Sequence, residues 1–71
     1  MVIDTSAIVA IALNEPEALS FEEAIVDDPV RLISAATVLE TAMALETRLG
    51  EKGGSELDLW LYKIGAEIVP V

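Results

Sequence analysis

Three consecutive polar residues, Asp4, Thr5 and Ser6, are the part of this sequence best suited to chemistry. They follow a short apolar stretch, residues 1–3, and precede a second apolar run over residues 7–13. This pattern predicts a buried strand that ends at Asp4 and turns directly into a helix. In open α/β sheets, ligands bind outside the carboxyl ends of the strands. Asp4 is therefore a candidate catalytic or metal-binding residue.

The same three residues have a simpler explanation as helix caps. Asp, Thr and Ser side chains all accept hydrogen bonds from the free N–H groups of a first helical turn. One such residue is enough for a cap, so the other two remain available for another role. From the residues alone, capping without chemistry and capping combined with chemistry both stay open.

A second acidic residue, Glu40, falls in the first half of a helix predicted over residues 35–49. Its neighbours on that helix face are small or uncharged: Ala36, Met43, Ala44 and Thr47. If the helix packs across the sheet, its N-terminal half lies near the end of the preceding strand, at the same edge as Asp4. The two carboxylates could then face one crevice. The ordinary alternative for Glu40 is a solvated helix glutamate.

Hydrophobic periodicity predicts the elements that must position these residues. The expected strands are the short, mostly apolar segments 1–4, 30–33 and 67–71. The expected helices are the segments 5–13, 15–26, 35–49 and 55–64. Strands that alternate with helices favour a parallel sheet with right-handed crossovers. The sequence has no linker-like segment, so we expect no domain boundary.

Capping residues and apolar stripes define these helices more closely. The predicted N-caps are Asn14, Ser34 and Ser55, and the predicted helix stops are Gly50 and Gly65. The Gly-rich residues 51–54 are expected to form a turn. The predicted buried stripes are Ala18, Phe21 and Ile25, then Val38, Ala42, Leu45 and Leu49, then Leu57, Leu61 and Ile64.

Charge and composition limit the possible functions. Thirteen acidic and four basic residues give a formal net charge of -9, which argues against a nucleic-acid site built from a basic patch. The charge is compatible with a basic protein partner, or with metal ions that bridge to phosphate. The sequence contains no cysteine and no histidine, which excludes disulfides and a typical zinc site. A bound metal would need oxygen ligands, which favours Mg²⁺ or Mn²⁺.

The sequence is unusually apolar for its length of 71 residues. Hydrophobic residues make up 54% of it, and its mean hydropathy is +0.55. A chain this short buries only about 60–65% of its unfolded surface, so we expect it to share its core with a partner or a larger domain. No apolar run reaches transmembrane length, and the N-terminus lacks the pattern of a signal peptide. We therefore expect a cytoplasmic protein with no membrane partner.

Three segments together resemble the start of a PIN domain. These are residues 1–11 (MVIDTSAIVAI), residues 14–17 (NEPE) and residues 32–40 (LISAATVLE). The resemblance is greatest to the VapC-type toxins of bacterial and archaeal toxin–antitoxin pairs, and it extends over essentially the whole chain. It implies a three-layer α/β/α fold with a parallel sheet. Because PIN domains are longer, residues 1–71 are expected to be the N-terminal portion of a single PIN domain, about its first half.

The resemblance also implies an activity. It is that of a metal-dependent endoribonuclease, with Asp4 and Glu40 as catalytic metal ligands and Thr5 or Ser6 as a supporting hydroxyl. The implied cofactor is Mg²⁺ or Mn²⁺, and the implied partners are RNA and a cognate antitoxin protein. PIN domains supply further acidic ligands from a later segment, so residues 1–71 alone are expected to be inactive. The first strand of a PIN domain also lies inside its sheet, so its open edge here predicts a homo-oligomer, a complex with the rest of the domain or an antitoxin, or aggregation.

A second hypothesis has no catalysis. The chain would be an acidic interaction module that binds a basic protein partner, while Asp4 only caps a helix and Glu40 is only solvated. The two hypotheses differ in whether Asp4 and Glu40 lie close enough to share a metal ion, because oxygen ligands sit at about 2.0–2.6 Å from such ions.

Overall fold

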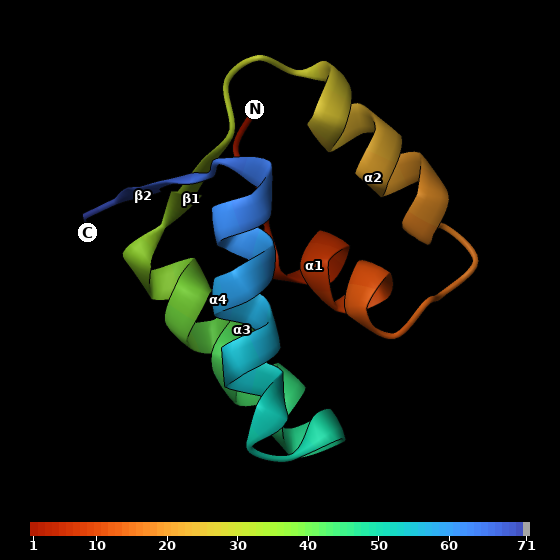
Figure 1. The fold of residues 1–71 in the computed structure, drawn as a ribbon, viewed down its shortest axis with the longest axis vertical. Coiled ribbons are helices and arrows are strands. Elements are labelled where there is room, and N and C mark those ends of the chain that lie inside the picture. Colours follow the sequence, from red (N-terminus) through yellow and green to blue (C-terminus); the bar gives the residue numbers. More distant parts are fainter. Residues whose placement is uncertain (71) are drawn as a thin grey trace.

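The computed structural model describes residues 1–70, which form helices and a small parallel sheet (Figure 1). In chain order the elements are α1 (Thr5–Ala12), α2 (Ala18–Asp27), β1 (Leu32–Ser34), α3 (Ala35–Leu49), α4 (Lys52–Ile64) and β2 (Glu67–Val69). Strands β1 and β2 pair in parallel, with Ile33 opposite Ile68. The predicted α/β class with parallel strands is confirmed.

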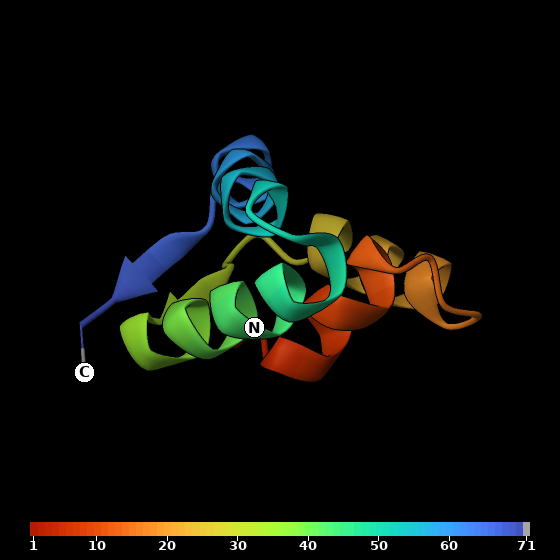
Figure 2. The same ribbon diagram turned by 90° about the horizontal axis from the view of Figure 1, so that it is seen from below.

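The helices lie on two levels of the molecule. Figure 2 shows α4 on one side and α1 and α3 together on the other, while α2 lies beyond α1 at the edge farthest from the strands. Helices α3 and α4 pack against each other along their length, and α1 packs against both α2 and α3. Since α1 and α3 each begin directly after a strand segment, this packing brings their N-terminal ends to the same part of the molecule.

The core takes one or two apolar side chains from nearly every element. Its buried members are Ile3, Ile8, Ile25, Ile33, Leu45, Leu57 and Leu61. The predicted stripes of α3 and α4 are confirmed, because Val38, Ala42, Leu49 and Ile64 pack against this cluster as partly buried residues. In the stripe of α2, Ile25 belongs to the cluster and Ala18 is buried, whereas Phe21 is only half-buried. Each Å² of apolar surface that this cluster removes from water contributes about 25 cal/mol, and this burial stabilises the packing of the helices on the strands.

The N-terminal segment differs from the strand expected over residues 1–4. Only Val2 pairs with a neighbour, through an isolated parallel bridge to Leu32. The Ile3 N–H donates to the Leu32 carbonyl at 2.7 Å, and the Leu32 N–H donates to the Met1 carbonyl at 2.9 Å. Asp4 is already the N-cap of α1, so the paired stretch is too short to form a regular strand. The predicted parallel direction is nevertheless correct.

The strand expected over residues 30–33 begins two residues later and ends one residue later, at Leu32–Ser34. Val30 is unavailable for sheet pairing because its N–H donates to the Asp28 carboxylate at 2.9 Å, which closes a turn after α2. Ser34 ends β1 and also caps α3, since its hydroxyl accepts the Thr37 N–H at 3.0 Å. The predicted Ser34 cap is confirmed.

Helix α2 begins at Ala18, later than the predicted start at residue 15. Asn14 does not cap this helix. It adopts a left-handed conformation with φ of 53°, which Asn tolerates better than most residues. Glu17 occupies the N-cap position without a side-chain hydrogen bond. The predicted Asn14 cap is therefore wrong, and turns at residues 13–14 and 16–17 precede α2 instead.

The turn expected over residues 51–54 is also wrong, because α4 already begins at Lys52 and Ser55 lies inside it. Gly53 is buried where α4 crosses α3, and an added Cβ would lie 2.7 Å from the carbonyl carbon and oxygen of Leu45. Only a residue without a side chain permits this approach of two helix backbones. Tertiary packing thus overrides the poor helix propensity of glycine.

This crossing predicts opposite effects for two adjacent glycines. We expect Gly53→Ala to destabilise the protein by about 1–3 kcal/mol, because the methyl group would push the backbones of α3 and α4 apart. Gly54→Ala is the matched control. Its Cβ would meet only the flexible Glu46 side chain, so the gain in helix propensity should stabilise the protein by up to about 1 kcal/mol. Urea unfolding of the intact protein measures both, and equal effects would contradict the close crossing.

The remaining helix ends follow prediction. Gly50 follows α3 with φ of 76° and Gly65 follows α4 with φ of 66°, a backbone region that favours glycine. Strand β2 covers Glu67–Val69, while the predicted strand continued to Val71, which lies outside the described residues. Within residues 1–70, no helix is long and apolar enough to cross a membrane.

Candidate functional site

Asp4 caps α1 through one of its two carboxylate oxygens. Its Oδ1 accepts the Ala7 N–H at 3.0 Å and the Ser6 hydroxyl at 2.9 Å. The Asp4 side chain is exposed, and no hydrogen bond among residues 1–70 uses Oδ2. Capping by Asp4 is therefore correct, and it leaves the second oxygen free for a ligand. Ser6 orients the carboxylate, which identifies one hydroxyl that supports Asp4 directly.

The hydrogen bonds of this cap also keep the carboxylate charged. The Ala7 N–H bond, followed by the Ser6 hydroxyl bond, lowers the pKa of Asp4 below its ordinary value of 3.8. Hydrogen bonds of this kind favour the ionised form. The helix dipole acts in the same direction, since the N-terminus of α1 is its positive end. Asp4 is therefore anionic at neutral pH, as a metal ligand must be.

We expect Ser6→Ala to raise the pKa of Asp4 only part of the way to 3.8, because the stronger Ala7 bond remains. A carboxyl group whose pKa is lowered in the folded state stabilises the fold fully when the pH lies above its ordinary pKa. This stabilisation is lost as the pH falls through the pKa of the folded state. The variant should therefore lose less stability than the wild type on acidification below pH 4. NMR titration of the Asp4 carboxyl carbon measures the shift; an unchanged midpoint would show that the Ser6 bond has no effect.

Glu40 lies exposed in the second turn of α3. The next residue, Thr41, is fully buried, and its hydroxyl donates to Thr5 Oγ1 at 3.1 Å. Thr5 in turn directly follows Asp4. A single hydrogen bond therefore joins the two residues that come immediately after the candidate carboxylates. The Thr5 hydroxyl, predicted to support Asp4, contacts α3 instead. Its partner Thr41 was not predicted to be a functional residue.

The donor chemistry of this site fits a hard divalent cation, but the number of donors is small. Carboxylate oxygens are the ligands that Mg²⁺ and Mn²⁺ prefer. Within residues 1–70, however, no three acidic side chains converge in a way that could hold a metal ion. Asp4 and Glu40 are thus two candidate ligands, and a full coordination shell needs further oxygens from water, substrate or other protein residues.

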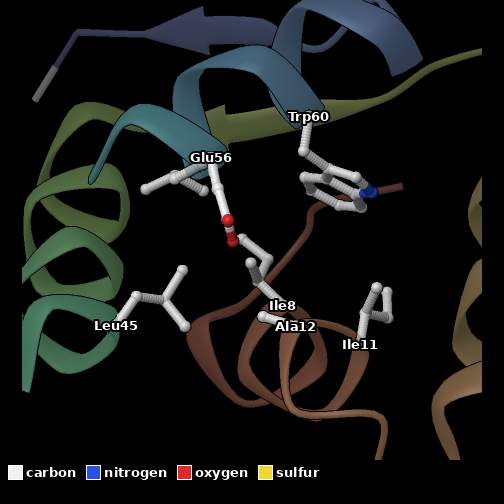
Figure 3. Close-up of a pocket in the computed structure, with 7 residues that line it drawn as sticks. Ile8, Ile11, Ala12, Leu45, Glu56 and Trp60 are labelled. Carbon is white, nitrogen blue, oxygen red and sulfur yellow. The ribbon is translucent and has the colours of Figure 1, made fainter. Parts of the chain in front are cut away.

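Three hollows lie beside α1, and only one of them touches the candidate site. The first, of about 240 Å³, lies between the N-terminal segment, α1 and α2, and Asp4 and Ser6 form part of its lining. The second is an apolar pocket of about 230 Å³ between α1 and α4 (Figure 3). Figure 3 shows the Trp60 ring and the Glu56 carboxylate reaching from α4 toward α1.

The apolar pocket continues along α4 as a groove. A neighbouring hollow of about 270 Å³ shares Ile11 and Trp60 with it and extends between α2 and α4. Glu56 lies toward one end of this groove and Glu22 toward the other. Neither Asp4 nor Glu40 lines it. The groove is therefore a separate apolar surface with acidic residues at its rim.

Arg31 donates hydrogen bonds to residues that line the Glu22 end of this groove. Its guanidinium donates three hydrogen bonds of 2.7 Å, to the carbonyls of Ile25 and Val26 in the last turns of α2 and to the carbonyl of Ile64 at the end of α4. A cation is favourable at the negative ends of helices. One side chain thus ties together two helix C-termini, and the same three residues line the groove.

The pattern of the PIN domain family matches residues 1–71, and the chain belongs to that family. Ribonuclease VapC of Mycolicibacterium smegmatis is 56% identical over 71 residues, which are 100% of this chain and 55% of that protein. Ribonuclease VapC30 of Mycobacterium tuberculosis is 54% identical over 71 residues, which are 100% of this chain and 54% of that protein.

The chain spans about half the length of these curated relatives. The predicted resemblance to PIN domains and to VapC-type proteins is confirmed over its whole length. A more distant relative, ribonuclease VapC28 of Mycobacterium tuberculosis, is 40% identical over 48 residues, which cover 68% of this chain and 36% of that protein.

Proposed function

We propose that this chain is part of a metal-dependent endoribonuclease that acts as the toxin of a toxin–antitoxin pair. Three relatives that carry the name ribonuclease VapC support the ribonuclease activity. The observation that carries the proposal is the Asp4 cap, in which Oδ1 is held by the helix and Oδ2 stays free at the edge where the strands end.

In this proposal Asp4 and Glu40 hold Mg²⁺ or Mn²⁺ together with oxygens outside this chain. The bound cation supplies activation of a water molecule and stabilisation of charge on the scissile phosphate. Ser6 and the Ala7 N–H fix the orientation of the Asp4 carboxylate and keep it ionised. Residues 1–71 alone bring too few ligands, so we expect them to cleave RNA poorly or not at all.

The direct test is RNA cleavage by the intact protein in the presence of Mg²⁺ or Mn²⁺. We expect cleavage that stops with EDTA and returns when excess Mg²⁺ is added, because the acidic site has little affinity for RNA phosphate without a cation. Glu40→Gln should abolish the cleavage, and Glu46→Gln on the same helix is the matched control. Cleavage that survives both EDTA and Glu40→Gln would contradict the proposal and favour a non-catalytic interaction module.

We propose a cognate antitoxin protein as the occupant of the apolar groove between α4 and the pair α1 and α2. The apolar lining with acidic ends suits an amphipathic helix that carries basic residues at its ends, and the net charge of -9 favours a basic partner. Trp60 is the only tryptophan of the chain and lines the groove, so its fluorescence should change when the antitoxin binds. An unchanged spectrum at saturation would place the antitoxin elsewhere.

We also propose that the chain self-associates through its N-terminal edge. Val2 is 75% exposed and pairs with β1 on one side only within the described residues, and such an open edge is a template for another chain.

Self-association should increase with salt, because salt screens the repulsion between chains of charge -9. Light scattering after size exclusion at low and high salt measures the molar mass. We expect a larger species at high salt, and Val2→Lys should reduce it by placing a charge at the edge. A monomer of 7.6 kDa under both conditions would contradict this interface.

A further inference from the structure

Thr41 makes an unusual hydrogen bond for a threonine in a helix. Its side chain is fully buried, and it is the one polar residue in the core of residues 1–70. Helical threonines commonly bond to the carbonyl four residues earlier, as Thr47 does to Met43 at 2.9 Å in the same helix. Thr41 instead donates across to Thr5 at the start of α1. The bond therefore connects two elements and does not serve α3 itself.

This bond also constrains the distance between α1 and α3. Elsewhere α1 and α3 contribute apolar side chains to the shared core, such as Ile8 and Leu45. Such apolar contacts tolerate small shifts of one helix against the other. A hydrogen bond between two hydroxyls fixes their separation within a narrow range of distance. Burial strengthens this constraint, because a displaced hydroxyl would lose its partner in an apolar environment.

The constraint acts on the candidate metal ligands through the backbone. Asp4 precedes Thr5 and Glu40 precedes Thr41, so the bond locks the two peptide segments that carry these carboxylates. A cation shared by two carboxylates requires their oxygens to stay within a few tenths of an ångström of the bonding distance. The Thr5–Thr41 bond is the described polar contact best placed to set that separation.

We propose that Thr41 is a positioning residue that sets the separation of Asp4 and Glu40 for a divalent cation. This inference rests on the proposed function, since it assumes that the two carboxylates share a metal ion. It gives Thr41 no contact with the metal or with RNA. Thr41 acts only through Thr5, so its loss should weaken metal binding more than RNA binding.

The test compares Mn²⁺ binding by variants of the intact protein, measured from the electron paramagnetic resonance signal of free Mn²⁺. Thr41→Val keeps the shape of the side chain and removes the hydroxyl, so we expect the affinity to fall at least about 10-fold, as for other residues that orient metal ligands. Thr41→Ser keeps the donor and should restore most of the affinity. Thr47→Val is the matched control and should bind like the wild type.

Two further readouts separate positioning from a general loss of stability. The Mn²⁺-induced rise in melting temperature should shrink in Thr41→Val, whereas a merely structural role would lower the melting temperature equally with Mn²⁺ and with EDTA. For RNA cleavage at a fixed Mn²⁺ concentration below saturation, we expect kcat to fall while KM for RNA stays unchanged. If Thr41→Val does not fold, Thr41→Cys, which has only a weak donor, is measured by the same criteria.

Asp4→Asn distinguishes the two levels of the proposal. If Asp4→Asn loses Mn²⁺ affinity and Thr41→Val keeps it, the metal site stands and the role of Thr41 is wrong. If neither variant changes Mn²⁺ affinity, the proposed metal site fails and the positioning role fails with it. Loss of affinity in both, with rescue by Thr41→Ser, is the result that the inference predicts.

Discussion

Asp4→Asn in the intact protein is expected to reduce Mg²⁺-dependent RNA cleavage by at least about 100-fold. Removing residues that only orient a ligand already costs about 10–100-fold, so loss of a charged ligand should cost more. The fold should remain intact, because the Asn side-chain oxygen can still accept the Ala7 N–H and cap α1. The measurement is the cleavage rate at saturating Mg²⁺, together with the melting temperature in EDTA.

Asp58→Asn provides the matched control for this loss of one negative charge. Asp58 is exposed on α4, and the apolar groove and the hollow beside Asp4 are both formed without it. Its variant should cleave RNA at the wild-type rate. Full activity in Asp4→Asn at saturating Mg²⁺ would show that Asp4 is a helix cap and nothing more.

Arg31→Met is expected to have the largest effect on stability. Three charge-assisted hydrogen bonds to helix carbonyls are lost at once, which we expect to cost about 3 kcal/mol after water replaces part of them. A chain of this size has a total stability of only about 4–10 kcal/mol. The variant should therefore keep only a fraction of this stability and melt far below the wild type. Urea unfolding followed by circular dichroism measures the loss.

Two variants show whether the effect belongs to the guanidinium. Arg31→Lys keeps the charge but cannot reach three carbonyls with a planar fork, so it should lose most of the same stability. Arg48→Met removes the other arginine, which is exposed in the last turn of α3, and should cost only a few tenths of a kcal/mol. If Arg31→Met and Arg48→Met were equally stable, the bridge between α2 and α4 would be energetically unimportant.

Local signals predicted much of this fold. Ser34, Gly50 and Gly65 mark helix ends in the structure as they do in the sequence, because caps and left-handed turns depend on one residue and its immediate neighbours. The Asp4 cap is local in the same sense, since its partners are two and three residues away. The alternation of apolar segments was enough to predict parallel strands.

The errors arose where distant contacts override local preference. The pair Gly53–Gly54 predicted a turn, yet both glycines lie inside α4. Glycine is needed at position 53 because the backbone of Leu45 leaves no room for a side chain there. The strand boundary at Val30 shifted because Asp28 takes its N–H for a turn. Neither contact can be inferred from propensity, since each depends on how elements meet in space.

The Thr41 and Arg31 contacts were also beyond local prediction, although the sequence contained a signal for each. Thr41 lies three residues after Val38 and four before Leu45, so it falls on the predicted buried stripe of α3 and needed a polar partner there. That partner is 36 residues away in sequence. Arg31 interrupts an apolar strand segment, which indicates a cation with a specific structural task.

The most direct test of this account is a crystal structure of the intact protein with Mn²⁺, in which anomalous scattering locates the ion. We expect one Mn²⁺ bonded to an oxygen of both Asp4 and Glu40, at about 2.0–2.6 Å from each. Asp4 should bond through Oδ2, because Oδ1 serves the helix cap. An ion bound without either carboxylate, or Asp4 and Glu40 carboxylates too far apart to share one, would contradict it.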